Sequence, residues 1–161
     1  MKVVDNFLPK KDFKFIKNLL SSLNFPWFYG DGISLKTPRK NEFQFVHTFY
    51  DEHKNNSPLF FKYLDPILAK INPRLLIKAK ANLLTRTEKV INHQFHYDFK
   101  DMVTSILYFS TTNGPTLFKN NIKVDCIENR LVTFDSNLKH ASSSCSDKNI
   151  RIVINFKKKI I

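Results

Sequence analysis

The 161-residue sequence predicts an α+β, mainly β fold, organised as one domain over residues 1–161. Three observations support this prediction: two segments with helical periodicity come early, short β-type runs follow from residue 74, and only three glycines occur. Hydrophobic residues make up 42% of the chain and charged residues 25%, as is typical of a folded globular protein. We expect N-terminal helices packed on an antiparallel sheet or sandwich, with a jelly-roll type barrel as the favoured architecture.

The N-terminal part is expected to form a short strand at 2–8 and then a helix that begins near Pro9. Apolar side chains recur at helical spacing up to Leu20. The segment FPWFYGDG at 25–32 interrupts this pattern with a proline and two glycines. Two roles fit Trp27 and the two aromatic residues after it: a mobile lid over a site, or packing into the interface between helix and sheet.

A second helix and then a series of strands are expected after this segment. The helix covers about 57–71, where apolar residues keep the helical period until an Asn-Pro pair ends it. From residue 74 the runs are short, rich in β-branched and aromatic residues, and separated by clusters of Asn, Gly, Ser and Asp. These runs predict strands at 74–84, 104–110, 115–120, 130–134 and 150–156.

The formal net charge of +12 raises the question of a nucleic-acid or other acidic partner. Lysine far outnumbers arginine and is scattered along the chain, with one run at 157–159. Because arginine is the residue preferred for bidentate recognition of phosphate, a solvated basic surface is favoured over specific nucleic-acid binding, which stays as an alternative.

Cysteine usage and the lack of long apolar runs favour a cytoplasmic protein that does not associate with membranes. Cys126 and Cys145 are too few for a disulfide framework or a structural zinc site, so we expect two free thiols. The N-terminus lacks the continuous apolar stretch of a secretory signal, and charges interrupt the other apolar runs.

The stretch HQFHYDF at 93–99 concentrates two histidines and an aspartate. In an extended segment side chains alternate between faces, so His96 and Asp98 point to the same side and can share a metal ion. An H-x-D triplet often arises by chance, and by itself the stretch fits a polar loop better than a metal site. His93 falls on the opposite face and is expected to lie on the surface or to support the ligands.

His140 offers a third ligand, at the edge of a polar turn that follows a β run ending at Phe134. Two histidines and one aspartate form the facial triad of non-haem Fe(II) oxygenases, which leaves positions open for a bidentate cosubstrate and for dioxygen. Zinc is more often given a closed tetrahedral set, and the sequence offers no fourth ligand at a suitable spacing.

The last predicted strand carries an independent signal. Arg151, Val153 and Asn155 fall on one face of this strand, opposite an aliphatic face that is ordinary core. An arginine that points into a barrel needs a carboxylate or phosphate partner. Within the predicted strand 104–110, the hydroxyl of Tyr108 can share that partner. Together the two residues form a sensible clamp for the distal carboxylate of a small dicarboxylic acid.

These elements resemble the Fe(II)- and 2-oxoglutarate-dependent dioxygenases, and within that family the prolyl 4-hydroxylase-like branch. The resemblance covers about residues 74–156, and it is carried by HYD at 96–98, KHA at 139–141 and RIVINF at 151–156. The segment ILYFSTTNGPTLF is similar to a GGxLxxF-like region of the family, with Asn113 where a first glycine is frequent. The same run looks like small hydroxylase-like proteins of marine phage and bacterial genomes.

The resemblance implies a double-stranded β-helix, a jelly-roll or cupin-like barrel, in which His96, Asp98 and His140 bind Fe(II). It also implies that Arg151 forms a salt bridge to the C5 carboxylate of 2-oxoglutarate and that Tyr108 hydrogen-bonds the same group. Asn82 and the inward-facing Asn155 are implied as further contacts of the cosubstrate or of the ligands.

The implied activity is hydroxylation of an unidentified substrate by dioxygen, with succinate and CO2 as co-products, in the cytoplasm of a bacterium or an infected host cell. Family analogy suggests peptidyl proline, while free amino acids, other small molecules and modified nucleobases stay open. The family often has a tyrosine near Leu83 or Leu84 that this chain lacks, which leaves the polar contacts of that strand open. The alternatives are a barrel without catalysis that recognises an anionic partner, and a cupin-like metalloprotein that does not use 2-oxoglutarate.

Overall fold

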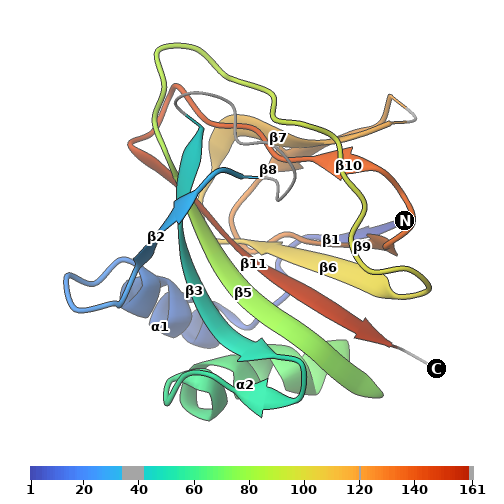
Figure 1. Cartoon of the computed structure of the whole chain (residues 1–161). Helices are drawn as coiled ribbons and strands as arrows, with labels where there is room; N and C mark the ends of the chain where they lie inside the picture. The colour runs from blue at the N-terminus through green and yellow to red at the C-terminus, as the bar shows by residue number, and fades with distance from the viewer. Residues whose placement is uncertain (34–41, 120, 160–161) are drawn as a thin grey trace.

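The computed structural model describes residues 1–33, 42–119 and 121–159. Within them, α1 (Lys10–Leu20) and α2 (Phe60–Ile71) cover one face of a large antiparallel sheet, and a small sheet stands over part of the other face (Figure 1). The predicted α+β, mainly β fold is confirmed, and the two sheets form the expected double-stranded β-helix.

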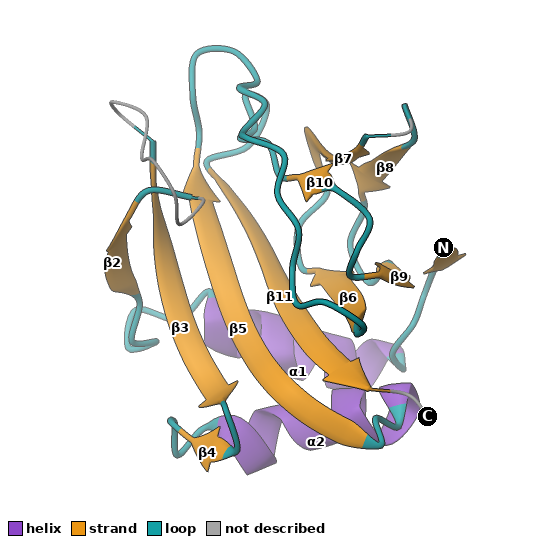
Figure 2. Cartoon of the chain, turned by 45° about the vertical axis from the view of Figure 1, so that its right-hand side comes forward, coloured by secondary structure: helices purple, strands orange, loops and turns teal. Residues whose placement is uncertain are grey.

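The large sheet has the strand order β1-β9-β6-β11-β5-β3-β2, with β4 paired to β3. Its longest strands, β5 (Leu75–Thr85) and β11 (Ile150–Lys159), pair antiparallel at its centre (Figure 2). The other strands of this sheet are β1 (Lys2–Val4), β2 (Phe28–Asp31), β3 (Phe43–Asp51), β4 (Lys54–Asn55), β6 (Val103–Tyr108) and β9 (Leu131–Asp135). The small sheet has the order β10-β7-β8 and consists of β7 (Thr112–Phe118), β8 (Lys123–Cys126) and β10 (His140–Ala141).

Alternation along β5 and β11 separates the core from the site. Ala79 and Ala81 of β5 and Ile154 of β11 are fully buried in the core that the two helices share with the sheet. Because neighbouring residues of a strand point to opposite faces, the positions between them point toward the small sheet. The helices contribute buried side chains at spacings of three and four, namely Phe13, Ile16 and Leu20 from α1 and Phe60, Leu64 and Ile67 from α2.

Strand β3 was not predicted, because no strand was expected between the aromatic segment at 25–32 and the helix at about 57–71. Its nine residues pair with β5 on one side and with β2 on the other. Phe45 and Phe49 point toward the core face, whereas Gln44 lines the pocket on the other face, so the segment has the period of a strand. The signal was missed because the segment lies between two helices and follows a stretch rich in charged and turn-forming residues.

The aromatic segment after α1 is divided between core and surface. Trp27 is partly buried, packs against Phe25 and donates from Nε1 to the carbonyl oxygen of Leu20 at 3.2 Å. Phe28 and Tyr29, in contrast, are exposed on the edge strand β2. Both cysteines are buried and free, as predicted. No helix within residues 1–33, 42–119 and 121–159 is long and apolar enough to cross a membrane.

Candidate metal centre

Backbone hydrogen bonds hold two histidines side by side. His96 lies in the loop between β5 and β6, and His140 begins β10. The N–H of His96 donates to the carbonyl oxygen of His140 at 2.9 Å, and the N–H of His140 donates back at 3.0 Å. The two imidazole centroids are therefore only 4.5 Å apart.

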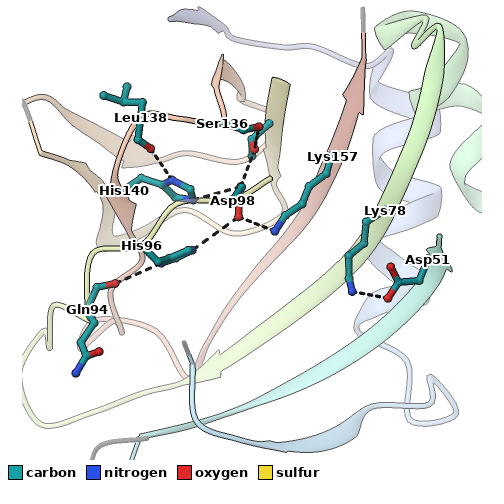
Figure 3. A network of polar contacts seen from close by, with 10 residues as sticks. Asp51, Lys78, Gln94, His96, Asp98, Ser136, Leu138, His140 and Lys157 are labelled. Carbon is teal, nitrogen blue, oxygen red and sulfur yellow. Dashed lines mark hydrogen bonds and ion pairs between the residues drawn. The ribbon is translucent and has the colours of Figure 1, made fainter. Parts of the chain in front are cut away.

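Asp98 completes a compact group of three potential metal ligands (Figure 3). Its Oδ1 lies 3.9 Å from Nε2 of His96, and its Oδ2 lies 3.5 Å from Nε2 of His140. The ligand atoms of the three residues all lie within 4.8 Å of one another. Neighbouring ligands of an octahedral ion that each lie about 2.1 Å from it are about 3 Å apart, so small side-chain movements close the set.

Each imidazole is oriented by its other ring nitrogen. Nδ1 of His96 lies 3.3 Å from the carbonyl oxygen of Gln94, and Nδ1 of His140 lies 3.1 Å from that of Leu138 (Figure 3). Because a carbonyl oxygen only accepts, Nδ1 carries the proton and Nε2 presents its lone pair toward Asp98. Burial lowers the pKa of His140, against the opposing effect of Asp98, and this favours the neutral form that binds a metal.

Asp98 is held in its ionised form by its neighbours. Oδ1 lies 2.5 Å from Nζ of Lys157, and Oδ2 accepts a hydrogen bond of 2.6 Å from Oγ1 of Thr104. Oγ of Ser136 lies 2.8 Å from the same Thr104 oxygen and donates to it. Burial alone would raise the pKa of Asp98, but Lys157, His140 and these hydrogen bonds lower it below its ordinary value.

The three ligands form one wall of a pocket between the sheets. The floor of the pocket is the inner face of β5 and β11, which carries Asn82, Arg151 and Asn155 together with three lysines. The structure thus brings the predicted metal ligands and three of the four predicted cosubstrate contacts into one cavity.

Arg151 is a buried cation that faces this pocket and is 2% exposed. Its Nε donates to the carbonyl oxygen of Gly114 at 2.8 Å, and one terminal nitrogen donates to Oγ1 of Thr116 at 3.3 Å. No carboxylate in the described part of the chain pairs with it. Because a buried guanidinium needs an anionic partner, Arg151 is suited to bind an anionic ligand in the pocket.

Tyr108, the fourth predicted cosubstrate contact, lies beneath the pocket rather than in its lining. Its ring packs below the guanidinium of Arg151, and its hydroxyl donates to Oγ1 of Thr116 at 2.7 Å. Burial raises the pKa of Tyr108 to about 12, so the hydroxyl keeps its proton. Thr116 accepts from both neighbours and lines the pocket, so its own hydroxyl proton is available to a ligand.

Two buried side-chain amide oxygens of pocket residues are unpaired among the described residues. Oδ1 of Asn82 and Oδ1 of Asn155 have no hydrogen-bond partner among the residues that the structure describes. Both residues line the pocket. Leaving a buried acceptor unpaired costs roughly 1–3 kcal/mol, so these atoms indicate a polar ligand or water in the cavity.

The fold is similar to that of several solved enzymes, although no protein-family model and no curated protein matches the chain. A prolyl hydroxylase from Trichoplax adhaerens, in complex with a peptide of hypoxia inducible factor, matches with a TM-score of 0.65 and 16% identity over 99% of this chain and 83% of that one. A prolyl-4-hydroxylase from Pseudomonas putida matches with a TM-score of 0.65 and 12% identity, over 98% of this chain and 91% of that one. The chain shares the fold of these two enzymes.

A third solved structure with this fold contains ligands. HygX from Streptomyces hygroscopicus, with nickel and 2-oxoglutarate bound, matches with a TM-score of 0.58 and 13% identity, over 96% of this chain and 80% of that one. At these low identities the comparisons establish the shared fold alone.

His93 corrects the prediction of a surface histidine in this fold. It is 7% exposed, and its Nδ1 lies 2.9 Å from Oγ of Ser142. Its backbone N–H also donates to the carbonyl oxygen of Ser142 at 3.0 Å. His93 therefore hydrogen-bonds the loop of His96 and Asp98 to the segment that follows His140. This fits the supporting role that the prediction also allowed.

Thr104, Thr116 and Lys157 are site residues that the sequence analysis did not predict. Thr104 begins the predicted strand 104–110, and Thr116 lies in the predicted strand 115–120. Alternation from Tyr108 places Thr104 on the same face of β6, which was an available signal. Thr116 gave no such signal, because its contact with Arg151 depends on how the two sheets face each other.

Proposed function

We propose that the chain is an Fe(II)- and 2-oxoglutarate-dependent dioxygenase that hydroxylates a substrate bound in this pocket. The observation that carries the proposal is a buried Arg151, with no carboxylate partner among the described residues, in the same cavity as a group of two histidines and an aspartate. Such a pair of sites fits a ligand with a carboxylate at one end and a metal-chelating group at the other. 2-Oxoglutarate has both groups.

The residues present fit both iron and the cosubstrate. His96, Asp98 and His140 would hold Fe(II), since two neutral imidazoles and one carboxylate are the donor set of non-haem iron oxygenases. Bound iron, 2-oxoglutarate and dioxygen supply the oxidative decarboxylation to succinate and CO2 and the hydroxylation of a C–H bond. Arg151 would bind the C5 carboxylate of the cosubstrate, and Thr116 would donate a hydrogen bond to it.

The remaining residues prepare this site for binding. Tyr108 fixes the hydroxyl of Thr116 and supports the guanidinium from below. Asn82 and Asn155 offer amide groups to the cosubstrate or to a water that it retains. Lys157 and Thr104 keep the carboxylate of Asp98 ionised and oriented, so that it can ligate without first losing a proton.

The class of primary substrate rests on analogy. The prolyl hydroxylase from Trichoplax adhaerens was solved with a peptide, which supports a peptidyl prolyl or other peptide residue as one class of substrate. A second candidate function is a metal-binding module without catalysis that recognises an anionic partner, and the net charge of +12 with three lysines in the pocket favours it.

Thermal melting without dioxygen tests the proposal. We expect Fe(II) or Mn(II) to raise the melting temperature and 2-oxoglutarate to raise it again, because a ligand that binds only the folded state stabilises it. His96→Ala should abolish the first shift, and Arg151→Ala should weaken only the second. The matched control is Arg130→Ala, which removes a half-buried arginine outside the pocket that pairs with Asp5, and it should keep both shifts. Melting curves of the wild type that do not respond to either ligand would refute the proposal.

A further inference from the structure

Three lysines gather on the inner face of the large sheet, in the pocket that contains the metal ligands. Lys78 of β5 and Lys157 of β11 lie directly opposite each other in the register, and Lys80 is the next residue of β5 on the same face. Like charges directly opposite each other destabilise an antiparallel pair of strands. The cluster therefore needs negative charge nearby.

Two of the three lysines have a carboxylate partner (Figure 3). Lys78 pairs with Asp51 of β3, and Nζ of Lys157 lies 2.5 Å from Oδ1 of Asp98. No hydrogen bond or ion pair joins the ammonium group of Lys80 to any residue of 1–33, 42–119 or 121–159. Burial, followed by the charges of Lys157 and Lys78, lowers the pKa of Lys80 to about 8, so the group is still mostly charged at pH 7.

Binding of the metal and the cosubstrate would leave this imbalance in place, because the two charges of the ion match those of the two carboxylates of 2-oxoglutarate. A divalent ion at the triad would draw on the same carboxylate of Asp98 that now compensates Lys157. The ion, Arg151, Lys80 and Lys157 would then carry five positive charges, against three negative charges from Asp98 and the two carboxylates of 2-oxoglutarate. The loaded site would still lack about two negative charges on the side of the lysines.

Resting on the proposed function, we propose that the primary substrate carries an oxyanion, a carboxylate or a phosphate, that binds between Lys80 and Lys157. Lys157 contacts Asp98, a metal ligand in the proposed function, so the oxyanion lies beside the metal and within a few bonds of the carbon that is hydroxylated. Asn155 lies directly opposite Lys80 in the register, so its side-chain NH2 group can donate to the same oxyanion.

This oxyanion site is distinct from the site of the C5 carboxylate. Arg151 lies opposite Leu84, and Lys80 is four residues from Leu84 along β5, a separation of about 13 Å. A five-carbon diacid that is anchored at Arg151 and chelates the metal ends at the metal. The lysines on the far side are therefore left for another ligand.

Anion titrations of the protein loaded with Mn(II) and 2-oxoglutarate, without dioxygen, test this inference. The probes are two matched pairs, butyrate against butyramide and glycerol 3-phosphate against glycerol, followed by calorimetry. We expect at least one anion to bind more tightly than its neutral counterpart, and the pair that responds identifies the oxyanion. The same titrations are made on the protein without metal or cosubstrate.

Two lysine variants locate the binding. Lys80→Met removes the charge and keeps the length of the side chain, and it should weaken anion binding by about tenfold or more. It should leave the Kd for 2-oxoglutarate within about twofold of the wild type and should not lower the melting temperature, because it removes a partly buried charge that has no carboxylate partner among the described residues. The matched control is Lys123→Met on β8, outside the pocket, which should leave both affinities unchanged.

Equal binding of each anion and its neutral counterpart would overturn the inference, as would equal anion affinity in the wild type and Lys80→Met. A loss of affinity for 2-oxoglutarate as large as the loss for the anion would also overturn it, because the lysine would then serve the cosubstrate. Failure of the wild type to bind Mn(II) and 2-oxoglutarate would refute the proposed function instead. In that case the titrations of the unloaded protein test the lysine site by itself. Anion binding that Lys80→Met removes would support the site, and the absence of anion binding would refute it.

Discussion

Removal of one hydroxyl group should weaken metal binding without disturbing the fold. Oγ1 of Thr104 donates to Oδ2 of Asp98 at 2.6 Å and accepts from Ser136, and Thr104 is 1% exposed. Thr104→Val replaces the hydroxyl by a methyl group of similar size, so the carboxylate loses a donor and no cavity forms. A hydrogen bond to a charged group is worth about 1.5–3 kcal/mol. Loss of a partner that orients a metal ligand costs roughly 10- to 100-fold in affinity.

Calorimetric titration with Mn(II), without dioxygen, measures this effect. Thr133→Val is a matched control on the adjacent strand β9, because its hydroxyl bonds to Ser105 on the opposite face of the sheet. We expect the Kd for Mn(II) to rise by roughly 10- to 100-fold in Thr104→Val and to stay unchanged in Thr133→Val. Wild-type affinity in a folded Thr104→Val protein would refute the conclusion that this bond prepares Asp98 for a metal.

Three further substitutions give separate tests. Burial lowers the pKa of Lys158 from 10.5 to about 8, a difference that corresponds to roughly 3 kcal/mol. Lys158→Met should therefore raise the free energy of unfolding at pH 7 by up to that amount, as measured by urea titration. Above about pH 8 the folded lysine loses its proton, whereas the unfolded lysine keeps it up to about pH 10.5, so the wild type should recover this stability between pH 8 and 10.5. A difference in unfolding free energy between wild type and variant that does not change with pH would contradict the reasoning. In Gly114→Ala the new Cβ would lie 2.1 Å from the carbonyl oxygen of Ser144, so calorimetric melting should show a lower melting temperature, and an unchanged one would disprove the clash. Thr116→Val should weaken 2-oxoglutarate binding about tenfold in titrations and leave Mn(II) binding unchanged, whereas equal losses would argue against a role in binding the cosubstrate.

The metal ligands were partly accessible from local sequence. Alternation over two residues is enough to place His96 and Asp98 on one side, and the structure brings their side chains together. His140 reaches them through a backbone pairing between segments more than forty residues apart in sequence. No local pattern encodes that pairing, so the position of His140 after a β run made it only a candidate, and the order of motifs in the family resemblance supported it.

The lysine cluster and strand β3 are the features that were not predicted from local patterns. Lys80 and Lys157 belong to strands whose register is set by packing of the whole sheet, so their proximity cannot be read from either segment. Strand β3 was missed for a different reason, because an alternating run between two helices was read as connecting structure. Both helices and the strands β5, β6, β7, β9 and β11 were predictable, since each carries its own hydrophobic period.

The affinity for 2-oxoglutarate with and without Mn(II), in the absence of dioxygen, tests most directly whether one pocket binds a metal and a dicarboxylate together. We predict that one equivalent of 2-oxoglutarate binds, that Mn(II) strengthens this binding, and that Arg151→Ala weakens it by about tenfold or more. The same affinity with and without Mn(II), or a wild-type affinity in Arg151→Ala, would contradict the assignment of this pocket to a metal and its cosubstrate.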